Sequence, residues 1–365
     1  MLSEFRTYAA DHAEPLDDLT PLVEAVREAR IVAVGESAHW IKQYQDLRLR
    51  LTKPLVERCG FDGYALESGF AEGRAVDAWV RGGPGELDDL ASRGLTNRMG
   101  QTPEIRELLA WMRVTTAPLG FLGLDVPATP TVPGIVRGED AELAELTGRY
   151  ANRHPLLAHE AYAGLDRADR DRVTALLTDL LTRLETRGAD RELRHQVRLA
   201  VLLDQGLRGN HAARDLGMAQ TALTVPAPGS KIVIGAANSH IQRVPMPLPG
   251  MSVPTMGTHL RDAGYLSVAV TTVGGVTTSR RRDPAEPGGV AVVDVALPPA
   301  RDDSVESALP EGGWILDLRP ARGKMTGPSS TRVLDGWQEV DVLEAYDLVV
   351  CLDHVEPSER LDAGW

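Results

Sequence analysis

The sequence predicts an α/β fold with a largely parallel central sheet flanked by helices. Short apolar runs of strand length recur along the chain, and segments with apolar residues at helical spacing separate them. No repeat of fixed period is present, which argues against a solenoid or a propeller. The 365 residues are 43% hydrophobic, enough for a large core. We therefore expect one domain over residues 1–365.

The first half of the chain alternates helices and strands. Apolar residues recur every three or four positions in the helices, whereas the strands are short, uninterrupted apolar runs. Pro54 is a position where a helix could kink, and Gly60 is a plausible cap after it. The expected helices are residues 15–30, 41–58, 72–80 and 104–113, and the expected strands are 31–34, 64–66 and 119–124.

The second half contains a long helical segment before the sheet resumes. Residues 126–138 are rich in Pro, Thr and Gly and indicate a loop, and residues 139–222 form a charged helical insertion or cap with leucine stripes typical of a core. We expect this insertion to shape the cleft. Residues 276–312 are loop-rich, with Arg280–Arg282 as a solvated basic loop. Further strands are expected at 231–235, 265–270, 290–295, 314–318 and 347–351.

Charge and cysteine content narrow the partners and the compartment. The 39 Lys and Arg residues against 52 Asp and Glu give a net charge of −13, which disfavours nucleic acid and anionic membranes as partners. Cys59 and Cys351 imply no disulfide framework and are typical of buried, inert thiols. The N-terminus lacks a signal-peptide pattern, and no apolar run reaches the ~20 residues that span a bilayer. We expect a cytoplasmic protein with a small-molecule substrate; the sequence leaves the oligomeric state open.

Four of the expected strands end in polar residues of catalytic type. They lead into Glu36 with His39, into Glu67, into Asp125, and into Asn238 with His240. Sites in open α/β sheets form outside the carboxyl ends of the strands, so these side chains converge if the strands are parallel neighbours.

Such a cluster is suited to general acid–base catalysis. A neutral His takes a proton near pH 7, a carboxylate fixes its tautomer, and a second His donates to a developing oxyanion. The same residues also have structural interpretations, since an acid after a strand can cap a helix or make a turn. Zn²⁺ or Mn²⁺ ligation is a further alternative, although we expect neither a metal nor another cofactor. The remaining histidines in helices or loops are expected at the surface: His12, His154, His159 and His195.

Other common chemistries lack their motifs. The chain has no Gly-x-Ser-x-Gly elbow for a serine hydrolase, no Walker loop, and no complete dinucleotide fingerprint. Neither cysteine belongs to a CxxC pair.

An ordered set of short motifs resembles the erythromycin esterase family, α/β hydrolases that act on macrolide lactones. The resemblance implies that Glu36 and His39 activate water, and that Arg48, Glu67 and His240 line the pocket and orient the substrate carbonyl. The matching runs are Val34–His39, Leu47-Arg48 with Leu55–Glu57 and Gly60-Phe61, Ala65–Glu67, Phe121–Asp125, Arg214–Ala219, Asn238–His240, Met256-Gly257 and Tyr346–Val350.

Two positions depart from the family pattern. Trp40 stands where the family usually has Gly, and would narrow the pocket or stack on the substrate. Ala237 stands where the family usually has His, which removes a donor whose loss can cost on the order of 2.7–4 kcal/mol. We expect substrate to be bound by Trp40, Arg48, Asp125 and Asn238. We expect the catalytic residues to be Glu36, His39, Glu67 and His240.

Three functions follow as alternatives. The first is a hydrolase of an ester or lactone with His39 as general base. The second is a non-hydrolytic tailoring enzyme of natural-product biosynthesis, in which the same base drives cyclisation, elimination or rearrangement in a drier pocket. The third is a resistance protein that sequesters a ligand without turnover.

Overall fold

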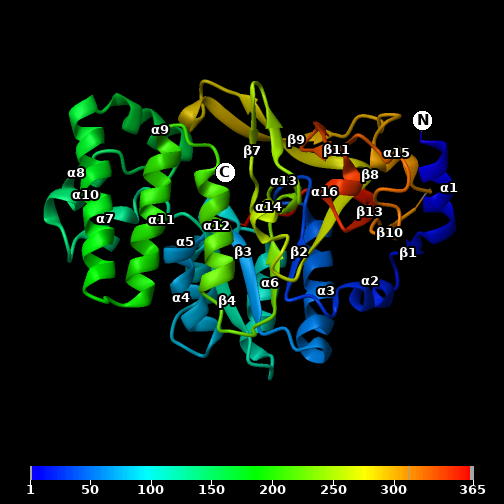
Figure 1. Ribbon diagram of the computed structural model, residues 1–365, viewed down its shortest axis with the longest axis horizontal. Helices are drawn as coiled ribbons and strands as arrows, with labels where there is room; N and C mark the ends of the chain where they lie inside the picture. The colour runs from blue at the N-terminus through cyan, green and yellow to red at the C-terminus, as the bar shows by residue number, and fades with distance from the viewer. Residues whose placement is uncertain (1, 311, 362–365) are drawn as a thin grey trace.

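A computed structural model describes residues 2–310 and 312–361, and its centre is a mixed sheet with the strand order β1-β10-β13-β8-β2-β5-β3-β4 (Figure 1). The run from β13 to β4 is parallel throughout, and β10 and β1 extend one edge antiparallel. The predicted α/β class with a largely parallel sheet is confirmed. The strands of this sheet are β1 (Glu14–Pro15), β2 (Ile31–Val34), β3 (Gly63–Gly69), β4 (Gly120–Asp125), β5 (Ile232–Gly235), β8 (Tyr265–Arg282), β10 (Trp314–Asp317) and β13 (Leu348–Val355).

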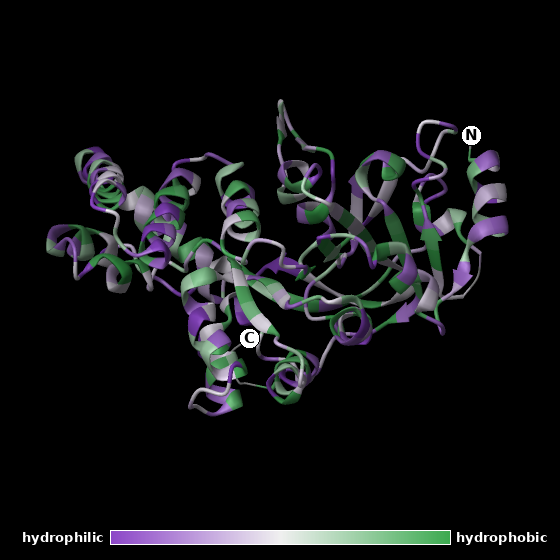
Figure 2. Cartoon of the chain, turned by 60° about the horizontal axis from the view of Figure 1, so that its bottom comes forward, coloured by the Kyte–Doolittle hydropathy of each residue, from purple (hydrophilic) through white to green (hydrophobic). Residues whose placement is uncertain are grey.

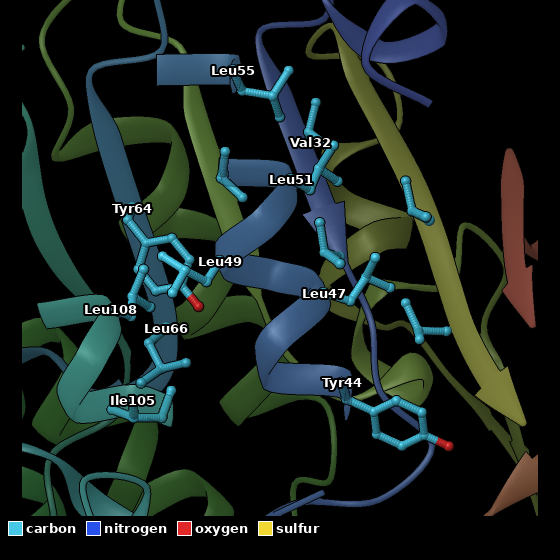
Figure 3. Close-up of a cluster of buried hydrophobic side chains, with 14 of the residues drawn as sticks. Val32, Tyr44, Leu47, Leu49, Leu51, Leu55, Tyr64, Leu66, Ile105 and Leu108 are labelled. Atoms are coloured by element: carbon cyan, nitrogen blue, oxygen red, sulfur yellow. The ribbon is translucent and has the colours of Figure 1, made fainter. Parts of the chain in front are cut away.

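Helices cover both faces of the sheet because successive strand residues point to opposite sides. In β2, Val32 and Val34 face one apolar cluster, and Ile31 and Ala33 face another. Figure 3 shows the first cluster, where leucines of α3 pack on β2 and β3. This face carries α2 (Thr20–Val26), α3 (Lys42–Cys59), α4 (Phe70–Val80), α5 (Leu87–Gly94) and α6 (Pro103–Val114). The opposite face carries α1 (Ser3–His12), α12 (Ala213–Thr224), α13 (Asn238–Ile241) and α14 (Met256–Leu260).

The helical segment after β4 lies beside the sheet and has an apolar core of its own. Figure 1 shows its helices grouped at one end of the molecule, and Figure 2 shows hydrophilic and hydrophobic residues mixed along them. The helix that follows this segment, α12, packs on the sheet. The segment contains α7 (Val132–Val136), α8 (Ala141–Gly148), α9 (Pro155–Gly164), α10 (Arg167–Thr186) and α11 (Arg191–Leu207).

A long β-arm extends from the sheet. The second half of β8 pairs antiparallel with β9 (Val290–Ala296), and the turn between them, η2 (Pro287–Gly289), contacts α9. The arm therefore runs from the sheet to the helical segment (Figure 1). The smaller elements are η1 (Thr96–Arg98), α15 (Val305–Ala308), α16 (Val342–Ala345) and the hairpins β6 (Met246–Leu248)–β7 (Met251–Val253) and β11 (Ser330–Val333)–β12 (Gly336–Glu339).

Several local expectations need correction. The helix predicted at 15–30 is shorter, because Glu14–Pro15 pair with β10 as an edge strand. The segment 126–138 contains α7. Arg280–Arg282 are exposed on a strand and not in a loop, because they pair with β9. His195 is buried and bonded to Thr221, and Cys59 is partly exposed at a helix end.

The expected cap is confirmed, because Gly60, at a φ of 74°, ends α3. Pro54 does not split the helix, which runs unbroken from Lys42 to Cys59. Within the described residues, no helix is both long and apolar enough to cross a membrane.

Candidate active site

The four strands that lead into polar residues are neighbours in the sheet, in the order β2-β5-β3-β4, and all are parallel. Their carboxyl ends therefore meet at one edge. Glu36 and His39 follow β2, Glu67 lies near the end of β3, and His240 follows β5. The structure brings these four side chains together, as the distances below show.

His39 is held by a buried ion pair. Its Nδ1 lies 2.7 Å from Glu36 Oε1, and the other oxygen of Glu36 lies 3.0 Å from an Arg48 Nη1. A carboxylate only accepts hydrogen bonds, so Nδ1 carries the proton and Nε2 of a neutral His39 keeps its lone pair. Nε2 lies 3.9 Å from Glu67 Oε1, beyond hydrogen-bond distance, and the side chain is 16% exposed. His39 thus presents a basic nitrogen to the site.

Glu67 is the acceptor at the centre of the cluster. Its Oε2 accepts from the Ala237 backbone N–H at 2.8 Å, and its Oε1 accepts from Arg214 Nη2 at 2.8 Å. His240 Nε2 lies 3.4 Å from the same Oε1. The side chain is buried, and two cationic partners compensate its charge.

Helix α12 supplies two charged residues that sequence reasoning left without a role. Arg214 binds both oxygens of Asp125 at 2.6–3.1 Å and lies 3.1 Å from His240 Nε2. Asp215 accepts from His240 Nδ1 at 2.9 Å and from the Met256 backbone N–H at 2.7 Å. The signal was available: two adjacent opposite charges begin a helix whose other early residues are mostly small and apolar. Asp215 is buried, and a buried charge needs a partner nearby.

The electrostatics of the cluster favour an ionised Glu67 beside a protonated His240. Burial acts to raise the pKa of Glu67, but His240, Arg214 and His39 outweigh it and hold that pKa well below its usual range. Burial acts to lower the pKa of His240, but Glu67 and Asp215 raise it to about 10. Burial likewise opposes the charge of Arg214, yet Asp125 and Glu67 raise its pKa. At neutral pH His240 is therefore a charged donor beside an ionised Glu67.

Comparison with known proteins places the chain in a family. The family model for erythromycin esterase matches residues 56–355, which include Glu67, Asp125, Arg214 and His240. The chain belongs to the erythromycin esterase family. Erythromycin esterase type II of Escherichia coli is 27% identical over 345 residues, covering 80% of this chain and 81% of that enzyme. Erythromycin esterase type I of Escherichia coli is 24% identical over 381 residues, covering 91% and 92%. Membership in this family implies that the chain is a hydrolase.

Solved structures support the fold of this erythromycin esterase family member. A mutant of the erythromycin esterase EreC in its open conformation has a TM-score of 0.78 at 21% identity, covering 94% of this chain and 96% of that one. A succinoglycan biosynthesis protein has a TM-score of 0.76 at 19% identity, with 99% of each chain covered. These likenesses concern the fold.

Three of the four residues that the sequence predicts to bind substrate are almost fully buried. Arg48 is 2% exposed and donates to the backbone oxygens of Val34 and Ala236, so it ties Glu36 to two strand ends. Asn238 is 3% exposed and exchanges two hydrogen bonds with the Val270 backbone. Asp125 is 4% exposed and holds Arg214. Their contacts in this structure are with protein groups, and whether they also touch a substrate stays a prediction.

Trp40, the fourth expected substrate-binding residue, lines a hollow beside His39. The two rings meet edge to face, with centroids 5.6 Å apart. Trp40 has a φ of 58°, in the left-handed region where glycine is favoured. This backbone conformation explains why Gly suits the position, and shows that Trp is accommodated at a cost in strain. The hollow is lined by His39, Trp40, Thr278, Ser279, Arg280 and Leu334.

Proposed function

We propose that the protein hydrolyses an ester or lactone bond with a water molecule that His39 activates. The observation that carries the proposal is the Arg48–Glu36–His39 chain, which fixes the Nδ1 proton of His39 and leaves Nε2 as a base. A general base must be able to reach the proton that it removes. His39 fits this requirement because its Nε2 faces the cluster, 3.9 Å from Glu67 Oε1, and its side chain is partly exposed.

The proposed reaction needs one water and no covalent intermediate. His39 Nε2 takes a proton as the water oxygen attacks the carbonyl carbon, and Glu36 stabilises the imidazolium. The oxyanion that forms accepts from His240 Nε2–H and from Arg214, which sits 3.1 Å from that nitrogen. Collapse of the intermediate breaks the carbon–oxygen bond, and His39 returns its proton to the leaving alcohol. The products are a carboxylic acid and an alcohol, or one hydroxy acid from a lactone.

The substrate class comes from the relatives. Two of them are named erythromycin esterases, so a macrolide-like lactone or another natural-product ester is the proposed substrate. Ala237 removes the side-chain donor expected beside Glu67, and Arg214 supplies a cationic donor at the same carboxylate.

Turnover in heavy-oxygen water tests the proposal. Hydrolysis of a macrolide or a simple lactone places one labelled oxygen in the new carboxylate, whereas His39→Ala and Glu36→Gln should abolish turnover. Full turnover in both variants would contradict the site assignment. Dialysis against a chelator should leave activity intact, because Arg214 and His240 already occupy the Glu67 oxygen that a metal would use.

A non-hydrolytic reaction is the second candidate, favoured by Trp40 in the wall beside the base. A pocket narrowed by Trp40 suits a reaction that excludes water, such as base-driven cyclisation or elimination. Product without the heavy-oxygen label would support it. Binding without turnover, unchanged in affinity by His39→Ala, would instead indicate that the protein sequesters its ligand.

A further inference from the structure

Two of the residues that line the hollow beside His39 have strained backbones. Four described residues other than glycine have positive φ: Trp40, Asn97, Arg98 and Leu334. Trp40 and Leu334, at 58° and 53°, both line the hollow, and the backbone N–H of Leu334 donates to the Ser37 oxygen between Glu36 and His39. Strain of about 1–3 kcal/mol per residue persists where the surrounding structure enforces it, typically in ligand sites. The shape of this wall is therefore built into the fold.

The arm β8–β9 supplies the other side of the hollow. Thr278 Oγ1 donates to the backbone oxygen of His39 at 2.7 Å, so a hydrogen bond joins β8 directly to His39. Two positions further on, Arg280 also lines the hollow and is paired with Val292 of β9. Since η2 at the end of the arm contacts α9, both ends of the arm are supported. Arg280 is thus held close to His39.

Arg280 carries a charge that the described part of the chain does not neutralise. Its neighbour Arg281 forms an ion pair with Asp335, and Asp335 also accepts from Ser279. The guanidinium of Arg280 makes no hydrogen bond or ion pair with any residue in the ranges 2–310 and 312–361, and the residue is exposed. The hollow therefore combines an aromatic wall, a base and an available guanidinium, while two carboxylates that contact its lining residues, Glu36 and Asp335, are already paired.

We propose, on the basis of the proposed function, that the ester or lactone carries an anionic oxygen group, a carboxylate or a phosphate, which Arg280 binds. The guanidinium offers paired N–H donors that match either group. Trp40 packs against the part of the substrate between that group and the scissile carbonyl. Arg280 is then a specificity-determining residue, and its contact forms on binding and persists through the reaction, so it acts mainly on KM.

Matched ester pairs test this inference on the full chain. Aryl butyrate is compared with the aryl monoesters of succinate, glutarate and adipate, and an aryl ester with a terminal phosphate forms the second arm. Each is assayed with the wild type, Arg280→Ala, and the control Arg282→Ala, which removes the same charge from an exposed position of β8 outside the hollow. We expect Arg280→Ala to lower kcat/KM on the best anionic ester by about tenfold or more, mostly through KM. The neutral ester and the control should change less than twofold.

The outcomes separate this inference from the proposed function. Preference for the carboxylate or the phosphate arm identifies the anionic group. Equal loss on neutral and anionic esters, or no loss in Arg280→Ala, overturns the inference while hydrolysis stands. If the wild type cleaves no ester, the proposed function fails, and calorimetry with glutarate and with inorganic phosphate decides the inference alone. Binding that Arg280→Ala weakens at least tenfold and Arg282→Ala does not would support it, and any other binding result would overturn it.

Discussion

Glu36 is the residue on which the proposed base depends, because each of its oxygens has a different partner. One orients His39 and the other pairs with Arg48, and both Glu36 and Arg48 are almost fully buried. A buried carboxylate without its cation is costly, so the pair is expected to matter for stability as well as for catalysis. As in a catalytic triad, the residues act in sequence: Arg48 orients Glu36, and Glu36 orients the base His39.

Replacing Arg48 tests that dependence. Arg48→Met leaves the Glu36 charge without its partner, and should lower the free energy of unfolding by about 3–5 kcal/mol and abolish turnover. Arg48→Lys keeps the charge but loses the donors to Val34 and Ala236, and should retain part of both. Arg50→Met, at an exposed position of the same helix, is the control. Denaturant unfolding and steady-state rates measure the effects; equal behaviour of the Arg48 and Arg50 variants would contradict the role.

The backbone at Trp40 gives a second residue-scale prediction. At a φ of 58°, Gly is free of the strain that a Cβ brings, so Trp40→Gly should be more stable than Trp40→Ala by about 1 kcal/mol. Trp79 is buried in α4, where the order should reverse because Gly is about 1 kcal/mol worse than Ala in a helix. Thermal and denaturant unfolding of the four variants measures both differences. An Ala variant more stable than the Gly variant at position 40 would show that the strain is relieved elsewhere.

At the scale of elements, the ends of β2 and β5 are joined to the interior of β8 through one side chain. Asn238 begins α13 after β5, and its amide bonds to both backbone groups of Val270 in β8. A Cβ on Gly35, at the end of β2, would lie 1.9 Å from the Asn238 Oδ1, so the close approach requires glycine. This packing sets where α13 starts, and therefore where His240 lies.

Removing the Asn238 amide should loosen that junction. Asn238→Ala leaves two buried backbone groups of Val270 without their partners, at about 1–3 kcal/mol each, and should also reduce activity by displacing His240. Ser239→Ala changes the next residue of α13 and serves as the control. Unfolding measurements together with turnover reveal the effect. Normal stability with normal activity would mean that Asn238 does not set the position of α13.

Sequence patterns locate the ends of the strands well, but they do not show which helices pack beside those ends. Each short apolar run with a polar residue after it is visible locally, so the positions of Glu36, Glu67 and His240 could be inferred before the sheet order was known. Arg214 and Asp215 come from a helix that follows a long helical segment, and no local pattern tells which strand end such a helix approaches. The second half of β8 was missed because its residues are mostly polar and charged, and its strand conformation depends on pairing with β9 and not on a local apolar run.

For the whole molecule, the buried His195 and the half-buried His240 have opposite electrostatic surroundings. His240 lies between Glu67 and Asp215, and despite burial these carboxylates raise its pKa to about 10. His195 lies in the helical segment beside Phe70, and burial, with Arg198 and Arg191, lowers its pKa to about 4. An unfolded histidine titrates near 6.5. The folded protein therefore holds one histidine charged and the other neutral across the neutral range.

These shifts predict a stability maximum near pH 6.5 for the two histidines together. Between pH 6.5 and about 10 the folded state holds a proton on His240 that the unfolded state has lost, so stability falls as pH rises. Between pH 4 and 6.5 the unfolded state holds a proton that folded His195 lacks, so stability falls as pH decreases. Each slope is at most about 1.4 kcal/mol per pH unit. Denaturant unfolding from pH 4 to 10 should show that His240→Gln flattens only the alkaline limb and His195→Gln only the acidic limb. If His240→Gln left the alkaline limb unchanged, the proposed acid of the site would be neutral at working pH, and stabilisation of the oxyanion would rest on Arg214.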